Sequence, residues 1–234
     1  MIKGIQGLLS RHIDLWKNNS FSLRVLLHFG FLAVVILLTY YAVDYTATYS
    51  SGNIVPDLLL DHIQRQDVGL IFFQGSFIFV LSLLGLAILI PESIPFGLAT
   101  TALFFLVRAG FLTLTHLSAP YIDSYSYINY DNQIPKMIFS MTSGNDLFFS
   151  GHTGFPFILA LIFWNYKYLR YYLLLCSFIA GVAVIAGHLH YSIDVFSAFF
   201  ISYGIFIISK RFFKKELAFF DQGKPSDQNK ITIS

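Results

Sequence analysis

Six long apolar segments constrain this chain more than any other feature of its sequence. A run of about 20 apolar residues can cross the hydrocarbon core of a membrane as a helix. The six segments that reach or approach this length are Val25 to Val43, Val68 to Ile90, Pro95 to Leu117, Phe148 to Tyr166, Tyr171 to Leu189 and Tyr191 to Ser209. We therefore predict an all-α, polytopic membrane protein, a six-transmembrane-helix bundle.

The composition excludes an ordinary soluble domain. Of the 234 residues, 56% are hydrophobic and only 12% are charged, whereas soluble domains carry roughly 25% charged residues. A single cysteine, Cys176, excludes an internal disulfide and a cysteine-based metal cluster. We expect a membrane-embedded protein with no nucleic-acid partner, and the oligomeric state is left open.

The distribution of basic residues predicts how the chain is oriented. Short cytoplasmic loops of membrane proteins are enriched in Lys and Arg. Twelve of the fifteen basic residues fall at the termini or between the fourth and fifth segments: Lys3, Arg11, Lys17, Arg24, Lys167, Arg170, Lys210, Arg211, Lys214, Lys215, Lys224 and Lys230. Both termini are therefore predicted to be cytoplasmic.

This orientation divides the chain into three parts. Residues 1–24 form a cytoplasmic amino-terminal segment, residues 25–213 the six-helix membrane domain, and residues 214–234 a cytoplasmic tail. The apolar spacing in the first segment suggests an amphipathic helix on the membrane face, and a plain solvated leader is the alternative.

Two polar motifs interrupt the apolar segments on the opposite side, which faces the periplasm, the exterior or a lumen. One is Ser150-Gly-His-Thr153 and the other runs from His188 to Asp194. Ionisable side chains at membrane depth are costly and usually mark a site, so we interpret the two motifs as one active site. The loops from Asp44 to Asp67 and from Ser118 to Leu147 would be its lid or its lipid entrance.

The first motif has the composition of a phosphate-binding helix start. Ser150 is a good N-cap, Gly151 lets the backbone approach an anion closely, and Thr153 adds a hydroxyl donor. His152 lies among them. A capped helix start that carries a surface histidine would have the same sequence, and this alternative is left open.

The second motif and Arg108 supply the groups that phosphoryl chemistry needs. His190 and Asp194 are four residues apart, which places imidazole and carboxylate on one helix face. A structural histidine–aspartate pair is the alternative. Arg108 lies within the third segment, as a phosphate clamp or as a partner of a carboxylate such as Asp194. His188 is either a third site histidine or a hydrogen-bond partner of a loop carbonyl. Two histidines and an aspartate can bind metal, but that would leave the phosphate cradle unexplained, so we expect neither a metal nor a cofactor.

These motifs resemble those of the type 2 phosphatidic acid phosphatase superfamily, and within it those of the sphingomyelin synthase family. NDLFFSGHT is similar to GD-x-x-FSGHT of that family, and GHLHYSIDV is similar to H-x-HYTIDV. Weaker similarity covers Val55 to Asp57 with Asp61, and Arg108 to Pro120. Thr101 and Ala109 stand where the phosphatase branch carries the lysine and proline of its K-x6-RP motif, which favours a transferase. Asn145 and Ser192 are milder departures.

The resemblance implies a role for each site residue. His190 would be the nucleophile, Asp194 would orient it, and His152 would act as general acid and base. Arg108, Ser150, Gly151, Thr153 and His188 would bind the phosphoryl group. The expected partners are a phospholipid donor, carrying phosphocholine or phosphoethanolamine, and a lipid acceptor such as ceramide. Two alternatives stay open: a lipid phosphatase or phospholipase-C-like hydrolase that uses water, and a non-catalytic lipid-binding protein or transporter.

Overall fold

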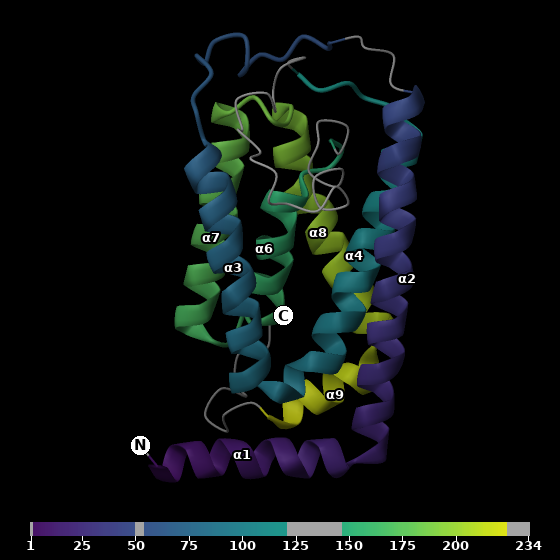
Figure 1. Cartoon of the computed structure of the whole chain (residues 1–234), viewed down its shortest axis with the longest axis vertical. Helices are drawn as coiled ribbons and strands as arrows, with labels where there is room; N and C mark the ends of the chain where they lie inside the picture. The colour runs from purple at the N-terminus through teal and green to yellow at the C-terminus, as the bar shows by residue number, and fades with distance from the viewer. Residues whose placement is uncertain (1, 50–53, 121–146, 224–234) are drawn as a thin grey trace, which may run out of the picture.

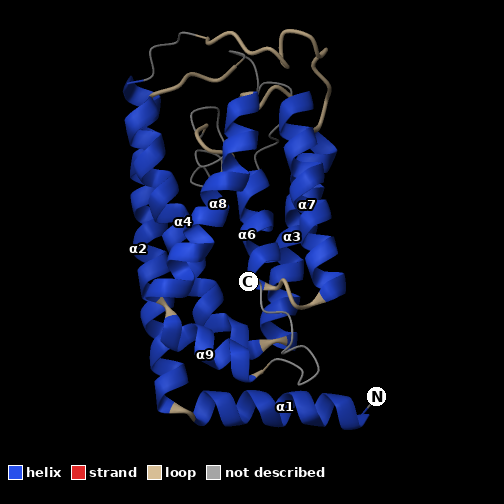
Figure 2. Ribbon diagram, turned by 180° about the vertical axis from the view of Figure 1, so that it is seen from behind, coloured by secondary structure: helices blue, strands red, loops and turns tan. Residues whose placement is uncertain are grey.

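The computed structural model describes residues 2–49, 54–120 and 147–223, and all regular structure in these ranges is helical. Among these residues, five helices are long and apolar enough to cross a membrane. They are α2 (Asn19–Tyr49), α3 (Gly69–Leu89), α4 (Ile94–Thr115) with the preceding turn η1 (Pro91–Ser93), α7 (Lys167–Ala186) and α8 (Ser192–Phe212). Figures 1 and 2 show them running side by side along the long axis of the molecule. The fold is that of a multi-pass membrane protein.

The predicted fourth span differs from the other five. Its residues form α6 (Gly151–Ile162), a helix of 12 residues, which at 1.5 Å per residue is about 18 Å long. The hydrocarbon core is about 30 Å thick, so a sixth full span is not confirmed. Ser150 caps the helix by accepting a hydrogen bond from the Thr153 N–H, and α6 ends at Ile162, with Phe163 as the C-cap before the turn into α7. Eight of its residues are buried, which makes α6 an internal helix packed against α7 and α8.

Helix α1 (Ile2–Lys17) lies across one end of the bundle, nearly perpendicular to the long helices (Figure 1). The Arg11 guanidinium pairs with Glu92 of η1, with 2.6 Å between Nη2 and Oε2. Nε2 of His12 lies 2.8 Å from the Ile88 carbonyl oxygen. The amphipathic segment expected from the sequence is thus a helix, fastened to the turn between α3 and α4.

The segment predicted as a cytoplasmic tail begins with a helix, α9 (Lys214–Gln222). Glu216 is buried and accepts a hydrogen bond from Nη1 of Arg24, and Nε2 of His28 lies 3.1 Å from its Oε1. Phe220 is also buried, with its ring centroid 5.5 Å from that of Phe163. These contacts explain why residues 214–222 pack against the bundle and do not extend from it as a tail.

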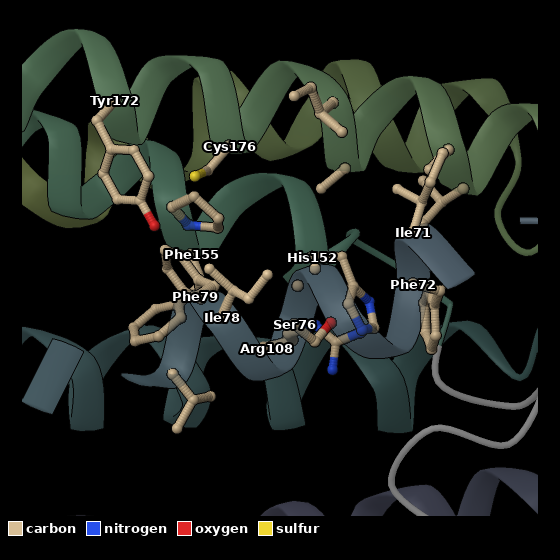
Figure 3. A pocket seen from close by; sticks show the side chains of 18 of the residues that line it. Ile71, Phe72, Ser76, Ile78, Phe79, Arg108, His152, Phe155, Tyr172 and Cys176 are labelled. Carbon is tan, nitrogen blue, oxygen red and sulfur yellow. The ribbon is translucent and has the colours of Figure 1, made fainter. Parts of the chain in front are cut away.

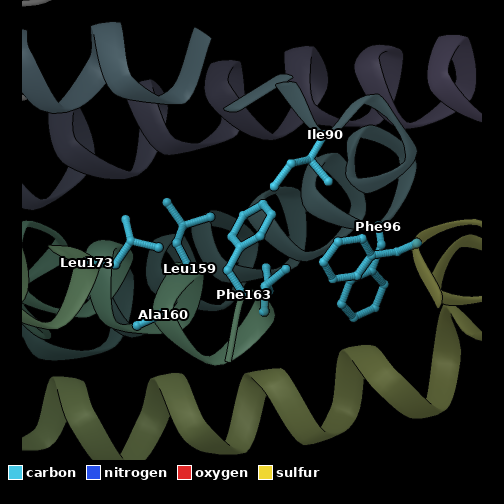
Figure 4. Packing of buried hydrophobic residues seen from close by; sticks show 8 residues of the cluster. Ile90, Phe96, Leu159, Ala160, Phe163 and Leu173 are labelled. Carbon is cyan, nitrogen blue, oxygen red and sulfur yellow. The ribbon is translucent and has the colours of Figure 1, made fainter. Parts of the chain in front are cut away.

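A hydrophobic cluster fills the bundle near the end that α1 and α9 close. Figure 4 shows its buried side chains, which come from the α3–α4 turn and from α4, α6, α7 and α9: Ile90, Phe96, Leu159, Ala160, Ile162, Phe163, Leu173 and Phe220. Burying apolar surface stabilises by about 25 cal/mol per Å². The cluster therefore anchors the carboxyl end of α6, and the amino end of α6 carries the candidate site.

The described part of the first predicted lid loop covers the opposite end. The Gln66 N–H donates to the Ala186 carbonyl (2.8 Å), and the Val55 N–H donates to the Tyr191 hydroxyl (3.2 Å). The loop thus lies against the turn that joins α7 to α8. Residues 121–146, which hold most of the second predicted loop, lie outside the described residues.

Candidate active site

The two polar motifs meet at the start of α6 and the start of α8. The Ser150 N–H donates to the main-chain carbonyl of Asp194, at 3.0 Å. The Ser150 hydroxyl oxygen accepts from the N–H and the hydroxyl of Thr153, at 3.4 and 3.3 Å. The cap of α6 is thereby tied to the first turn of α8, which joins segments that are far apart in sequence.

His190 and Asp194 lie together and are buried, but they do not share one helix face as their spacing predicted, because α8 begins at Ser192 and His190 lies in the turn before it. Nδ1 of His190 lies 3.3 Å from Oδ2 of Asp194. The same oxygen accepts the N–H of Tyr191 at 3.0 Å, which closes a capping box at the start of α8. A carboxylate on Nδ1 fixes the tautomer of an imidazole and leaves Nε2 for chemistry.

His152 faces this pair. Its ring centroid is 6.3 Å from that of His190 and 4.5 Å from that of Phe72 on α3. The buried Nδ1 of His152 and Oδ1 of Asp194 have no hydrogen-bond partner among the described residues. Two imidazoles at this separation can act on opposite sides of one bound group.

Arg108 reaches the site from α4. Its side chain is 2% exposed, and Nε donates to the Phe149 carbonyl at 2.8 Å, just before the cap of α6. A Cβ added to Gly151 would lie 3.1 Å from Nε and 3.3 Å from Cζ of Arg108. Glycine at this position therefore lets the guanidinium lie against the first turn of the helix.

Thr153 and His188 have contacts that support the frame of the site. Thr153 is fully buried and its hydroxyl donates to the helix cap. Nε2 of His188 lies 3.0 Å from the Ile63 carbonyl oxygen, and its φ is 53°. For His188 this is the loop-carbonyl contact that the sequence left open.

Asp57 supports the site through hydrogen bonds. Sequence reasoning assigned it no role, although it lies in a stretch of weaker similarity to the family. Its Oδ2 accepts the N–H and the hydroxyl of Ser192 at 2.7 and 2.9 Å, and its Oδ1 accepts the N–H groups of Leu59 and Leu60 at 3.0 and 3.2 Å. Residues 54–68, which precede α3, form the outer loop. The Asp57 carboxylate ties this loop to the start of α8 at Ser192, two residues before Asp194.

Asp57→Asn is expected to destabilise the protein by about 1–3 kcal/mol at neutral pH, because hydrogen bonds to a charged group are lost. Burial alone would raise the pKa of Asp57, but the hydrogen bonds from Ser192, Leu60 and Leu59 outweigh it and lower the pKa from 3.8. The stabilisation is therefore full above pH 3.8 and is lost as the pH falls through the lowered folded-state pKa. Thermal unfolding in detergent should show a wild-type advantage that is constant near neutral pH and shrinks below about pH 4. An advantage that grows on acidification would contradict this assignment.

Beside His152 lies an apolar cavity of about 470 Å³, bounded by α3, α4, α6 and α7. Arg108, Gly151 and His152 line it, together with aromatic and aliphatic side chains (Figure 3). Among the described residues, no group of three or more His, Cys, Asp or Glu side chains is placed to hold a metal ion. Fold and site together define a multi-pass membrane protein in which two histidines, a carboxylate and an arginine gather beside an apolar cavity.

The family comparison agrees with this class. Residues 143–211 match the family model described as PAP2 superfamily C-terminal. The match covers less than a third of the chain, and it contains both histidine motifs. It supports the PAP2 superfamily, whose members are generally phosphatases and phosphotransferases, and it does not separate the sphingomyelin synthase family from the rest. The comparisons with curated proteins and with solved structures returned no match.

Proposed function

We propose that the protein moves a phospholipid head group, phosphocholine or phosphoethanolamine, to a lipid alcohol such as ceramide through a phosphohistidine intermediate. The observation that carries this proposal is the meeting of His152 with the His190–Asp194 pair, at ring centroids 6.3 Å apart. His152 also lines the apolar cavity, so a lipid and the reacting groups have adjoining places.

In the first half-reaction, Nε2 of His190 attacks the phosphorus atom of the donor. An N–P bond forms and the P–O bond to diacylglycerol breaks. Protonated His152 gives its proton to the departing oxygen, so that neutral diacylglycerol leaves. Asp194, on Nδ1 of His190, stabilises the positive charge that the ring acquires.

In the second half-reaction, neutral His152 takes the proton of the acceptor hydroxyl. The acceptor oxygen attacks phosphorus, the N–P bond breaks, and His190 returns to its starting state. The positive charge of Arg108 and the first N–H groups of α6 stabilise the phosphoryl oxygens in both steps. Thr153 and His188 are predicted as phosphate ligands from the sequence. In this scheme they affect the phosphate indirectly, Thr153 through the helix cap and His188 through the outer loop.

We further propose that the site faces the non-cytoplasmic side, with both termini in the cytoplasm. Helices α1 and α9 lie together at one end of the bundle, and the outer loop and the α7–α8 turn lie at the other (Figure 1). The basic residues of the termini favour the cytoplasm for the first of these ends.

The test is a reconstitution in liposomes. Protein is supplied with phosphatidylcholine or phosphatidylethanolamine labelled in the head group, with and without ceramide. When ceramide is present, we expect the labelled head group to appear on ceramide. Label found only as free phosphate or free head-group phosphate would identify a hydrolase, and lipid binding with no product of either kind would identify a binding protein or transporter.

Gly151→Ala is expected to lower the transfer rate by about 100-fold, since displacing a catalytic group by even 1 Å has effects of this size. The new Cβ would press on the Arg108 guanidinium at 3.1 Å. The control is Gly110→Ala on α4, where an added Cβ meets nothing within 4 Å. Wild-type transfer in the Gly151 variant would show that the arginine position does not matter.

A further inference from the structure

The cavity beside His152 is long, and its charged and imidazole groups line only one part of it. It runs along α7 from Val184 to Tyr172, twelve positions that span about 18 Å of helix. The polar groups of the site, Arg108 and His152, line one part of it, and Phe79, Phe155 and Ile78 line the part beyond (Figure 3). A cavity that is apolar away from a charged site suits a molecule with a polar head and a hydrocarbon chain.

We propose that this cavity holds one hydrocarbon chain of the reacting lipid, and that Tyr172 and Cys176 set the longest chain that fits. The inference rests on the proposed function, because the head group of that lipid must lie between His152 and His190. The cavity is the place of the chain attached to the oxygen that His152 protonates or deprotonates. Donor and acceptor would therefore use it in turn.

The volume of the cavity is sufficient for one hydrocarbon chain. A water molecule in the liquid takes up about 30 Å³, and a methylene group is of similar size. The volume of about 470 Å³ therefore corresponds to roughly 15 methylene groups.

Tyr172 and Cys176 of α7 line the far end of the cavity. Figure 3 shows Tyr172 and Cys176 toward the opposite end from His152 and Phe72. The bulk of these two side chains limits the depth that is open to a hydrocarbon chain, because forcing extra methylene groups into filled space displaces side chains from their preferred rotamers.

Helix α3 forms the outer wall of the cavity, and a lipid chain can enter the cavity past this helix. Phe72 is the one buried residue of α3, whereas α4 has nine buried residues. Ile71, Ile78 and Val80 of α3 line the cavity and are also largely exposed on the surface of the helix. Helix α3 therefore separates the cavity from the surrounding lipid with little packing of its own.

Chain-length selectivity tests the proposal. Cys176→Phe shortens the cavity, so kcat/KM for donors with 16-carbon chains should fall at least about tenfold, as it does when a hydrophobic pocket is too small for its substrate. Donors with 8-carbon chains should react at the wild-type rate. Tyr172→Ala lengthens the cavity and should shift the optimum to longer chains. The matched control is Leu175→Phe, one position away on α7 and 55% exposed, which should leave the profile unchanged.

A binding measurement separates failure of this inference from failure of the proposed function. Phosphatidylethanolamine with a photoreactive diazirine at the chain end is irradiated with the full-length protein, and the labelled peptides are sequenced. We expect label at Tyr172 or Cys176, and at Phe72 when the diazirine is placed beside the head group. These labels in a protein without turnover would uphold the cavity and overturn the proposed function. Label confined to lipid-facing residues such as Phe178, or a Cys176→Phe profile identical to wild type, would overturn the inference.

Discussion

Replacing His190 with alanine is expected to abolish head-group transfer, with kcat lowered by about 10⁴-fold or more, as when an enzyme loses its nucleophile. No other described side chain is held by Asp194 in the position that His190 occupies, so the intermediate cannot form. The measurement is transfer of labelled head group to ceramide in liposomes. The matched control is His62→Ala, a histidine of the outer loop whose Nδ1 lies 2.8 Å from the Leu58 carbonyl oxygen; it should transfer at close to the wild-type rate.

Asp194→Asn tests the same claim with less change of shape. The amide cannot stabilise a positive ring on His190, and such replacements lower kcat by about 10⁴-fold. Since Oδ2 also accepts the Tyr191 N–H, circular dichroism must show that the helix content is kept. Substantial transfer by a folded His190→Ala variant would exclude His190 as the nucleophile, and wild-type transfer by a folded Asp194→Asn variant would show that His190 does not need the carboxylate.

His152→Ala is expected to slow the reaction of natural phospholipids by about 10²–10⁴-fold, the usual contribution of a general acid or base. The departing alcohol of diacylglycerol needs a proton and His152 supplies it in our scheme. A p-nitrophenyl ester of phosphocholine has a leaving group that needs no proton. The variant should therefore release the first equivalent of nitrophenolate at close to the wild-type rate, measured as a burst by stopped-flow absorbance.

Turnover after the burst separates the two duties of His152. Activation of the acceptor hydroxyl still requires a base, so steady-state transfer from the nitrophenyl donor should stay slow in the His152→Ala variant. If the burst is as impaired as the reaction of natural phospholipids, His152 positions the substrate and does not transfer a proton.

The membrane helices follow from the sequence because hydropathy and length act locally. Five of the six predicted segments became long apolar helices, and α2 extends beyond its predicted span, from Asn19 to Tyr49, because a helix need not end where the hydrocarbon does. The exception is the predicted fourth segment, which contains the Ser150 cap, and the cap starts α6 late. Because α6 is buried among other helices and needs no full crossing, its hydropathy predicts a span that its length does not provide.

The candidate site could be predicted in part. The i, i+4 spacing of His190 and Asp194 and the cap at Ser150 are local signals, and both are present in the structure. The hydrogen bond that ties Ser150 to Asp194 joins distant parts of the chain. The sequence indicates that the two motifs belong to one site only because both are predicted to emerge on the same side of the membrane.

The supporting contacts could not be predicted because they leave no periodic signal. Asp57 and Ser192 are 135 positions apart, and Arg24 and Glu216 are 192 apart. Each depends on how whole helices pack, which one sequence does not state. The same holds for the cavity, whose walls come from four helices. Apolar residues that line a cavity cannot be told from apolar residues that face lipid.

The most direct test of the account is to trap the intermediate. Protein is mixed with donor labelled with ³²P, quenched in alkali within milliseconds, and digested for mass spectrometry. We predict an acid-labile phosphoryl group on His190 that disappears when ceramide is added. Transfer that proceeds with no labelled histidine, or with the label on His152, would contradict it.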